Sequence, residues 1–213
     1  MITQTEIFLA PNHPEVQRDL ADCHGMHRRV MRMFRHVNNT RDANEVLYRL
    51  LAHTTSLSVL IQAQQYPDIT SLPHGYALPP VHTFDLTDTF DCHVVGETIR
   101  FELVANPTKK SLMSATRVDL TDAGAIIGWL ERRLADAGCQ LMLAELSMQS
   151  LPTIHGRHPA GALTYQAYHF RGSARVTDVA LLNLARIRGV GPAKAYGCGL
   201  LTTQASDRLS RTP

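Results

Sequence analysis

The sequence predicts an α+β fold with antiparallel sheets, and three observations lead to this class. Apolar residues alternate over short segments, which is typical of strands, whereas 23–34 and 122–138 repeat their apolar residues at helical spacing. These two helical segments belong to separate series of strands, divided by a passage over 67–86 that is rich in Pro, Gly and His. A length of 213 residues allows one large domain or two small ones, each with enough chain to bury a core.

The first series combines three strands with one helix. The segments that predict its strands are 3–10, 44–52 and 57–66. Asp22 is a favourable N-cap residue for the helix over 23–34, because its carboxylate can accept hydrogen bonds from the first-turn backbone. The passage 67–86 predicts a loop with little regular structure. We therefore expect an N-terminal domain over residues 1–88 that carries this helix.

The second series repeats these element types. Its strands are expected over 97–107, 116–120, 139–149 and 199–204, with further strands within 152–176 linked by a basic turn at His155 to His158. Thr121 is the expected N-cap of the helix over 122–138, Trp129 is expected in its core face, and 178–188 predicts a last helix. Two successive α+β units with antiparallel strands fit tandem ferredoxin-like, or RRM-like, folds, the second over residues 92–206.

Composition excludes several classes of protein. Hydrophobic residues make up 44% and charged residues 19%, as in ordinary globular chains rather than disordered ones. No apolar run approaches the roughly 20 residues of a membrane span, and the first residues carry no secretory signal pattern. The four cysteines lie far apart without a C-x-x-C pair, which argues against a zinc ribbon. We therefore expect a cytoplasmic protein that has no membrane partner.

Charge is unevenly distributed, although the formal net charge is only +2. Segment 23–41 holds five arginines and three histidines with no acidic residue, whereas 50–99 holds five acidic residues and no Lys or Arg. Over 146–206 six Lys or Arg residues again stand against one acid, Asp178. Two basic regions on either side of an acidic one favour a surface that binds a polyanion. On charge alone, solvated helix faces are an equal alternative.

Four glycines lie within the segment RGVGPAKAYGCGLL, residues 188–201: Gly189, Gly191, Gly197 and Gly199. A Walker A loop needs Gly-Lys followed by Ser or Thr, which this segment lacks. A dinucleotide loop needs G-x-G-x-x-G between a strand and a helix, whereas these glycines follow a predicted helix. A nucleotide cofactor is therefore not expected. Two roles stay open: a helix C-cap at Gly189 followed by tight packing, or backbone that approaches another chain closely, with Lys194 near a phosphate.

Four segments, in this order and at comparable spacing, resemble the CRISPR-associated endoribonuclease of the type I-E system, the CasE family. They are RDLADCHGMHR, FELVANPTKK, GWLERRL and GVGPAKAYGCGLL. The resemblance covers nearly the whole chain, from residue 3 to about residue 204. It implies two ferredoxin-like domains, cleavage of the CRISPR repeat RNA at the base of its hairpin without a metal ion or other cofactor, and retention of the crRNA with the other Cascade subunits. It also implies that the glycine-rich loop packs beside the RNA and helps to hold the arrangement of the two domains.

Cleavage of RNA without a metal ion uses the substrate's own 2′-OH as nucleophile and leaves a 2′,3′-cyclic phosphate and a 5′-OH. The enzyme must supply a base, an acid for the 5′-oxygen and positive charge for the phosphorane. Histidine suits either proton-transfer role, since its reference pKa is about 6.5. His27 matches the family's catalytic histidine, and His24 lies three residues earlier on nearly the same helix face.

Two roles stay open for His24, because members of the family often have a tyrosine at this position. It could form an acid–base pair with His27, or it could position the RNA. A metal cluster with Cys23 is a third reading, for which no second pair of ligands is present in the sequence.

Contacts to RNA are expected from the basic segments. Arg28, Arg32 and Arg35 share one side of the first helix. His155, Arg157 and His158 are expected at the tip of a hairpin that matches the family's basic hairpin, and further candidates for phosphate contacts are Lys109, Lys110, Arg117 and Lys194. A non-catalytic RNA-binding module is the alternative function, and it would make His24 and His27 dispensable. A phosphate-binding metabolic enzyme is disfavoured, because the glycine-rich loop lacks both nucleotide motifs.

Overall fold

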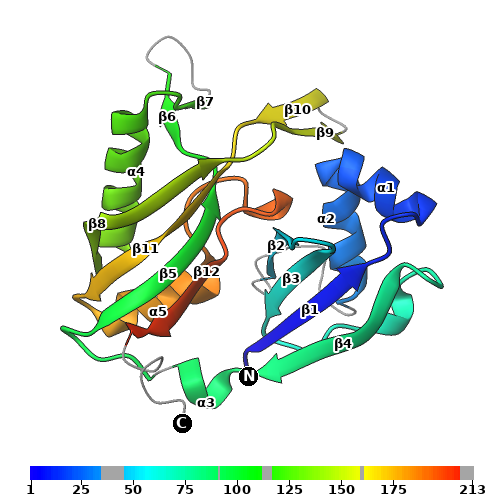
Figure 1. Cartoon of the computed structure of the whole chain (residues 1–213), viewed down its shortest axis with the longest axis horizontal. Coiled ribbons are helices and arrows are strands. Elements are labelled where there is room, and N and C mark those ends of the chain that lie inside the picture. Colours follow the sequence, from blue (N-terminus) through cyan, green and yellow to red (C-terminus); the bar gives the residue numbers. More distant parts are fainter. Residues whose placement is uncertain (35–45, 91, 112–116, 159–160, 207–213) are drawn as a thin grey trace. The chain divides into compact units, whose positions relative to one another are not determined.

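The computed structural model describes residues 1–34, 46–90, 92–111, 117–158 and 161–206 (Figure 1). The chain forms two compact units. The first comprises Met1–Phe90, Ile154–Thr164 and Lys194–Gly197, and the second comprises Asp91–Thr153, Tyr165–Ala193 and Cys198–Pro213. Two segments from the second half of the sequence are therefore part of the unit that holds the N-terminal strands.

The first unit is built on a four-stranded antiparallel sheet in the order β2-β3-β1-β4. Its strands are β1 (Thr3–Leu9), β2 (Leu47–Ala52), β3 (Leu57–Ala63) and β4 (Ala77–Asp85). Two helices, α1 (Pro14–Ala21) and α2 (Cys23–Arg32), pack on one face, where Val16, Met26 and Val30 share a core with Ile7 and Leu9 of β1. The predicted strands and the helix that begins after Asp22 are confirmed, whereas α1 was not predicted.

The prediction of a loop over 67–86 is wrong, because residues 77–85 form β4 at the edge of the sheet. The pairing of β4 with β1 shifts register between Glu6 and Phe8, and Pro79 and Pro80 lie in this irregularity. Proline cannot donate to a strand ladder and is tolerated at edges and bulges. The Pro-rich composition is therefore compatible with an interrupted edge strand, and the other regular element in this passage is the short helix η2 (Ile69–Ser71).

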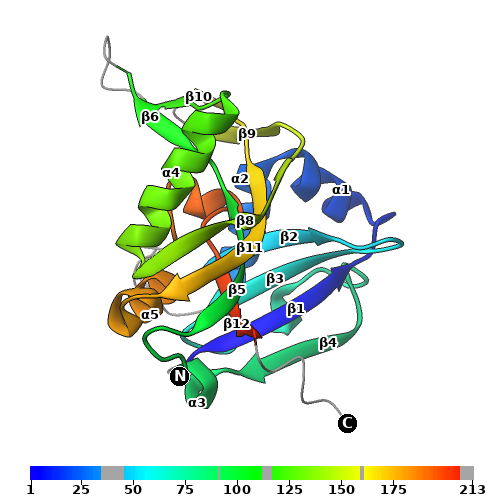
Figure 2. The same cartoon turned by 60° about the vertical axis from the view of Figure 1, so that its left-hand side comes forward.

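The second unit has a sheet in the order β12-β5-β11-β8, again antiparallel throughout. Its strands are β5 (Thr98–Ala105), β8 (Cys139–Ser150), β11 (Tyr168–Val176) and β12 (Leu201–Ala205). Figure 2 shows α4 (Ala123–Asp136) and α5 (Val179–Arg188) on one side of this sheet. Trp129 of α4 is buried in the core, as predicted. The N-cap of α4 is Asp122 rather than Thr121, since the Asp122 carboxylate accepts from the N–H of Ala125.

Two short antiparallel ribbons are inserted between the elements of the second sheet along the chain. One pairs β6 (Thr108–Lys110) with β7 (Arg117–Asp119), and the other pairs β9 (Ile154–His158) with β10 (Gly161–Tyr165). The predicted hairpin is confirmed by the pairing of β9 with β10, whereas the turn expected at His155 to His158 is wrong in its position, because these residues form β9 itself. Residues 159–160 between the two strands lie outside the described part of the chain.

Both sheets have the strand order of a ferredoxin-like fold, so the predicted fold class is confirmed. In the second unit the elements run β5, α4, β8, β11, α5 and β12, with the first strand of the series in the centre of the sheet. The first unit follows the same order, with η2 in the place of the second helix. Two short helices complete the structure, α3 (Thr87–Phe90) and η3 (Lys194–Tyr196). Within the described ranges, no helix has the length and apolar character needed to cross a bilayer.

Candidate active site

The first turn of α2 lies against strand β9 within the first unit (Figure 1). Asp22 Oδ1 accepts the backbone N–H of His24 at 3.1 Å and the backbone N–H of Arg157, on β9, at 3.0 Å. One carboxylate thus caps the helix and anchors the strand. A Cβ atom on Gly156 would lie 2.4 Å from Cys23 Sγ and 3.1 Å from Asp22 Oδ1, so only glycine allows this approach.

Three histidines and a tyrosine gather at this end of α2. The ring centroids of His24 and His27 are 6.3 Å apart, and the ring of His158 stands edge-on to His24 at 5.1 Å. The ring of Tyr196 lies 6.4 Å from His24 and 6.1 Å from His27, in an edge-on arrangement to both. Three separate segments of the sequence, α2, β9 and η3, therefore meet at one group of aromatic rings.

Tyr196 was missed by the sequence analysis, which considered only glycines and Lys194 in this loop. Its position depends on the seating of η3 on β2, where the hydroxyl of Tyr48 donates to the carbonyl oxygen of Ala195 at 3.0 Å. Gly197 adopts a positive φ of 85°, and a Cβ there would stand 3.5 Å from the Tyr48 ring. The one signal in the sequence was an aromatic residue beside a glycine in a segment without strand or helix periodicity.

The acidic and phenolic groups of this site have shifted pKa values. Partial burial raises the pKa of Asp22, but hydrogen bonds from the backbone of Arg157, His24 and Gly25, with the nearby charge of His24, bring it below its ordinary value. Burial raises the pKa of Tyr196, and the negative charges that Cys23 and Asp22 can carry raise it further. Near neutral pH the site therefore holds a carboxylate at the helix cap and a protonated phenol beside the imidazoles.

The other three glycines of the loop lie in the second unit, where they have structural roles. Gly189, with φ 75°, ends α5 by donating its N–H to the carbonyl of Ala185 at 2.8 Å, as the C-cap alternative predicts. A Cβ on Gly191 would lie 2.9 Å from two ring carbons of Trp129. Gly199 donates its N–H to the carbonyl of Val104 on β5 at 2.7 Å. These three glycines permit close packing and turns, with φ angles that glycine adopts without strain.

The basic residues predicted for RNA binding are divided between the units. In the first unit Arg28 and Arg32 are exposed on α2, His155 and Arg157 are exposed on β9, and Lys194 is half-buried in η3. Arg35 lies outside the described residues. In the second unit Lys109, Lys110 and Arg117 are exposed on the β6–β7 ribbon, where Lys110 and Arg117 are direct cross-strand partners.

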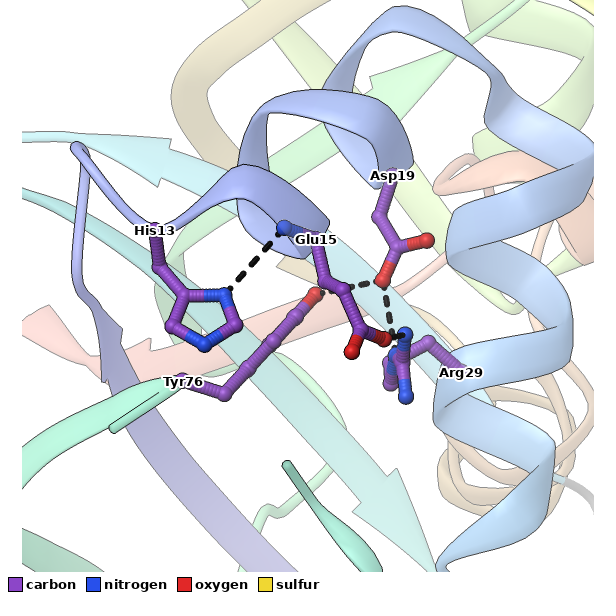
Figure 3. A network of polar contacts seen from close by, with 5 residues as sticks. All are labelled: His13, Glu15, Asp19, Arg29 and Tyr76. Carbon is purple, nitrogen blue, oxygen red and sulfur yellow. Dashed lines mark hydrogen bonds and ion pairs between the residues drawn. The ribbon is translucent and has the colours of Figure 1, made fainter. Parts of the chain in front are cut away.

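Arg29 differs from its neighbour Arg28, because it is buried in a polar network that joins α1 to α2 (Figure 3). Its Nε donates to Asp19 Oδ2 at 2.7 Å, and its guanidinium also forms an ion pair with Glu15. The hydroxyl of Tyr76 donates to the same oxygen of Asp19 at 2.9 Å, and the guanidinium carbon of Arg29 lies 5.0 Å from the Tyr76 ring centroid. Burial disfavours the charge of Arg29, but the two carboxylates raise its pKa above the ordinary value. This arginine holds the histidine helix in place.

The arrangement can perform proton transfer at two points of one substrate. Two imidazoles on adjacent turns of a helix can serve as base and acid, and the exposed arginines of α2 lie along the same helix. Among the described residues no three His, Cys, Asp or Glu side chains gather closely enough to hold a metal ion. The structure therefore adds no ligands to the hypothesis of a metal cluster at Cys23 in this part of the chain.

The class of protein follows from a family match. The chain belongs to the family described as CRISPR associated protein, whose model matches residues 4–204. Within that family the chain is similar to CRISPR-associated endoribonuclease Cse3 of Thermus thermophilus, with 30% identity over 93% of this chain and 97% of that protein. It is 28% identical to the CRISPR system Cascade subunit CasE of Escherichia coli, over 85% of this chain and 91% of that protein.

A solved structure matches most of the chain. It is Thermus thermophilus Cse3 bound to an RNA that represents a pre-cleavage complex, and it matches with a TM-score of 0.78 and 30% identity over 95% of this chain and 98% of that chain. The resemblance inferred from four sequence segments is therefore confirmed.

Proposed function

We propose that the chain is an endoribonuclease that cleaves CRISPR repeat RNA at the base of its hairpin without a metal ion. It then stays bound to the mature crRNA as a Cascade subunit in the cytoplasm. The observation that carries the proposal is the pair His24 and His27, with ring centroids 6.3 Å apart, in a chain 30% identical to an endoribonuclease. Rings at this separation can reach the 2′-oxygen and the 5′-oxygen of one phosphodiester together.

In the proposed reaction one imidazole accepts the proton of the 2′-OH as this oxygen attacks phosphorus. The bond between phosphorus and the 5′-oxygen breaks, and the other imidazole, protonated, donates its proton to the leaving oxygen. The products are a 2′,3′-cyclic phosphate and a 5′-OH. Cations near the cluster stabilise the charge that develops on the phosphorane oxygens, and Arg28 on α2 and Arg157 on β9 are exposed candidates for this role.

RNA binding is assigned in this proposal to the remaining basic residues. Arg32 extends the exposed side of α2, His155 and His158 lie on β9, and Lys194 lies in η3. On the β6–β7 ribbon, Lys110 and Arg117 are direct partners, an arrangement of like charges that is unfavourable without a bound anion. An RNA phosphate between them would remove the repulsion.

The experiment that tests the proposed function uses the repeat RNA of the protein's own CRISPR array in buffer with EDTA. We expect cleavage of the parent RNA and none of a copy with a 2′-deoxyribose at the cleavage nucleotide, because the nucleophile is missing. Cleavage of the deoxy copy, or a requirement for added metal, would contradict the mechanism. Tight binding without any cleavage would identify a non-catalytic RNA-binding module instead.

The residue-level test compares two histidines of the first unit. His27→Ala should abolish cleavage while hairpin binding is retained, because it removes a proton-transfer group. His74→Ala is the matched control, since His74 is exposed in a loop of the same unit. If His27→Ala cuts at the parent rate, the assignment of His27 is wrong.

The two open roles of His24 give different kinetics. If His24 is the partner of His27 in acid–base catalysis, His24→Ala lowers the single-turnover rate and leaves the dissociation constant of the hairpin unchanged. If His24 positions the RNA through binding, the dissociation constant rises and the rate at saturating protein recovers.

A further inference from the structure

The ring of Tyr196, in the glycine-rich loop, lies beside both candidate catalytic histidines. Its centroid lies 6.4 Å from that of His24 and 6.1 Å from that of His27, with interplanar angles of 63° and 77°. Edge-to-face geometry of this kind is the favoured arrangement of aromatic rings at such distances. The contact therefore restricts the orientation of two rings at once.

The loop holds this ring in a defined place. Ala193 and Gly197, on either side of η3, have φ angles of 56° and 85°, in the left-handed region. Between them the carbonyl of Ala195 accepts the hydroxyl proton of Tyr48 from strand β2. The helical turn that carries Tyr196 is therefore flanked by two residues in left-handed conformations and hydrogen-bonded to a core strand.

The ring of His24 is not oriented by a hydrogen bond at Nδ1 from the described part of the chain. Its Nδ1 is buried and has no hydrogen-bond partner within the described residues. The neighbouring rings therefore restrict the orientation of His24, and they come from three segments: His27 on α2, His158 on β9 and Tyr196 in η3. The phenol is also protonated near neutral pH, so it adds no charge that would compete for the proton of either imidazole.

We infer that Tyr196 is a positioning residue of the cleavage site, whose aromatic ring holds the imidazoles of His24 and His27 in the orientation that cleavage requires. This inference rests on the proposed function. It also gives the glycine-rich loop a role in this chain, because the backbone conformation around Gly197 is what brings the ring to α2. Both of these contacts are made by the ring of Tyr196, so the ring is the group that the inference assigns.

The test measures single-turnover cleavage and hairpin affinity for Tyr196→Ala, Tyr196→Leu and Tyr196→Phe. A displacement of catalytic groups by about 1 Å costs up to roughly 100-fold in rate, so we expect Ala and Leu to lower the rate by about 10- to 100-fold and Phe to stay near the parent. The dissociation constant of the hairpin should be unchanged in all three. Tyr66→Ala, on a side chain that is 56% exposed, is the matched control and should cut like the parent.

Three cleavage results would overturn the inference. They are parental rates for both Ala and Leu, a loss for Phe as large as for Ala, or a loss that is entirely in binding. Circular dichroism shows which variants are folded, and Leu provides a variant of similar bulk if Ala is not.

A second measurement is independent of cleavage. Imidazole ¹H–¹³C signals of His24 and His27, assigned with His24→Asn and His27→Asn, should shift in Tyr196→Ala because the aromatic neighbour is gone, and should stay unchanged in Tyr66→Ala. Unchanged signals in Tyr196→Ala would overturn the inference even if the parent cleaves RNA. If the parent does not cleave while the signals shift, the proposed function fails and the ring contact stands.

Discussion

Gly156→Ala tests the contact between β9 and the start of α2, on which the histidine cluster depends. The added Cβ would lie 2.4 Å from Cys23 Sγ and 3.1 Å from Asp22 Oδ1, so either the packing is compressed or the strand moves away. Compression of a well-packed site costs about 1–3 kcal/mol. Movement of the strand breaks the hydrogen bond from Arg157 to the Asp22 carboxylate, a charge-assisted bond that contributes about 1.5–3 kcal/mol.

The protein takes the cheaper of these two responses, and each costs about 2 kcal/mol. Replacing glycine also restricts the unfolded chain, which offsets about 0.5–1 kcal/mol of the cost. We therefore expect the free energy of unfolding to fall by about 1–1.5 kcal/mol. The cleavage rate should fall by more than the loss of folded protein explains, because His158 on β9 contacts His24 and moves with the strand.

Two assays are used. Urea unfolding, monitored by circular dichroism, measures stability, and single-turnover kinetics measure cleavage. Gly128→Ala is the matched control, because its Cβ would meet only Arg132 Nη1 at an ordinary 3.5 Å, and alanine within α4 should stabilise by up to about 1 kcal/mol. Cys23→Ala in the Gly156→Ala background removes the closest obstacle and should recover about 0.5 kcal/mol or more as a coupling energy. Parental stability and parental cleavage for Gly156→Ala would refute the contact, and strict additivity with Cys23→Ala would refute the role of the sulfur.

Four further variants test the electrostatics of the two units. The folded pKa of Asp22 is lowered, so its carboxylate stabilises above the unfolded pKa of 3.8 and this contribution is lost as pH falls through the folded value. Between about pH 5 and pH 2 the parent should therefore lose more stability than Asp22→Asn in unfolding titrations, and equal losses would contradict the anchor. Arg29→Ala should lower the free energy of unfolding by about 3–5 kcal/mol, because it leaves the Asp19 carboxylate buried without its partner. The exposed neighbour gives the opposite pattern, since Arg28→Ala should change stability by less than about 0.5 kcal/mol and lower the salt slope of RNA binding by about 0.7–0.9, measured by titration at several salt concentrations. Lys110→Ala should relieve repulsion of Arg117 and leave the ribbon slightly more stable by thermal melting, yet weaken RNA affinity at low salt, whereas unchanged affinity would exclude this ribbon from the RNA interface.

Much of the fold was predictable because local signals agreed with the tertiary structure. Asp22 stands at the start of an apolar helical repeat, and both features specify the same helix. Strand β4 was not predictable by composition, because its prolines mark a loop unless the bulge opposite β1 is known. The division into domains over 1–88 and 92–206 stays a prediction, as do the roles of the site residues.

The candidate site was predictable only where it is local in sequence. His24 and His27 lie three residues apart on one helix, so their proximity follows from helical spacing. The approach of His158 and Tyr196 depends on Gly156, on Gly197 and on the pairing of distant segments. Contacts of this kind cannot be inferred from the periodicity of the sequence. The sequence therefore predicted His158 at a hairpin tip and did not predict its contact with His24.

The first unit draws on segments that the ribosome makes at very different times. Helix α2 emerges early, whereas residues 154–164 of the same unit emerge after β5 and β8 of the second sheet, and residues 194–197 emerge after β11 as well. Since domains generally fold as they are completed during synthesis, the N-terminal sheet can form while its histidines still lack their neighbours from β9 and η3. A partly made or truncated chain would thus carry the imidazoles without the groups that surround them. The order of the sequence itself delays assembly of the cluster until Tyr196 has been synthesised.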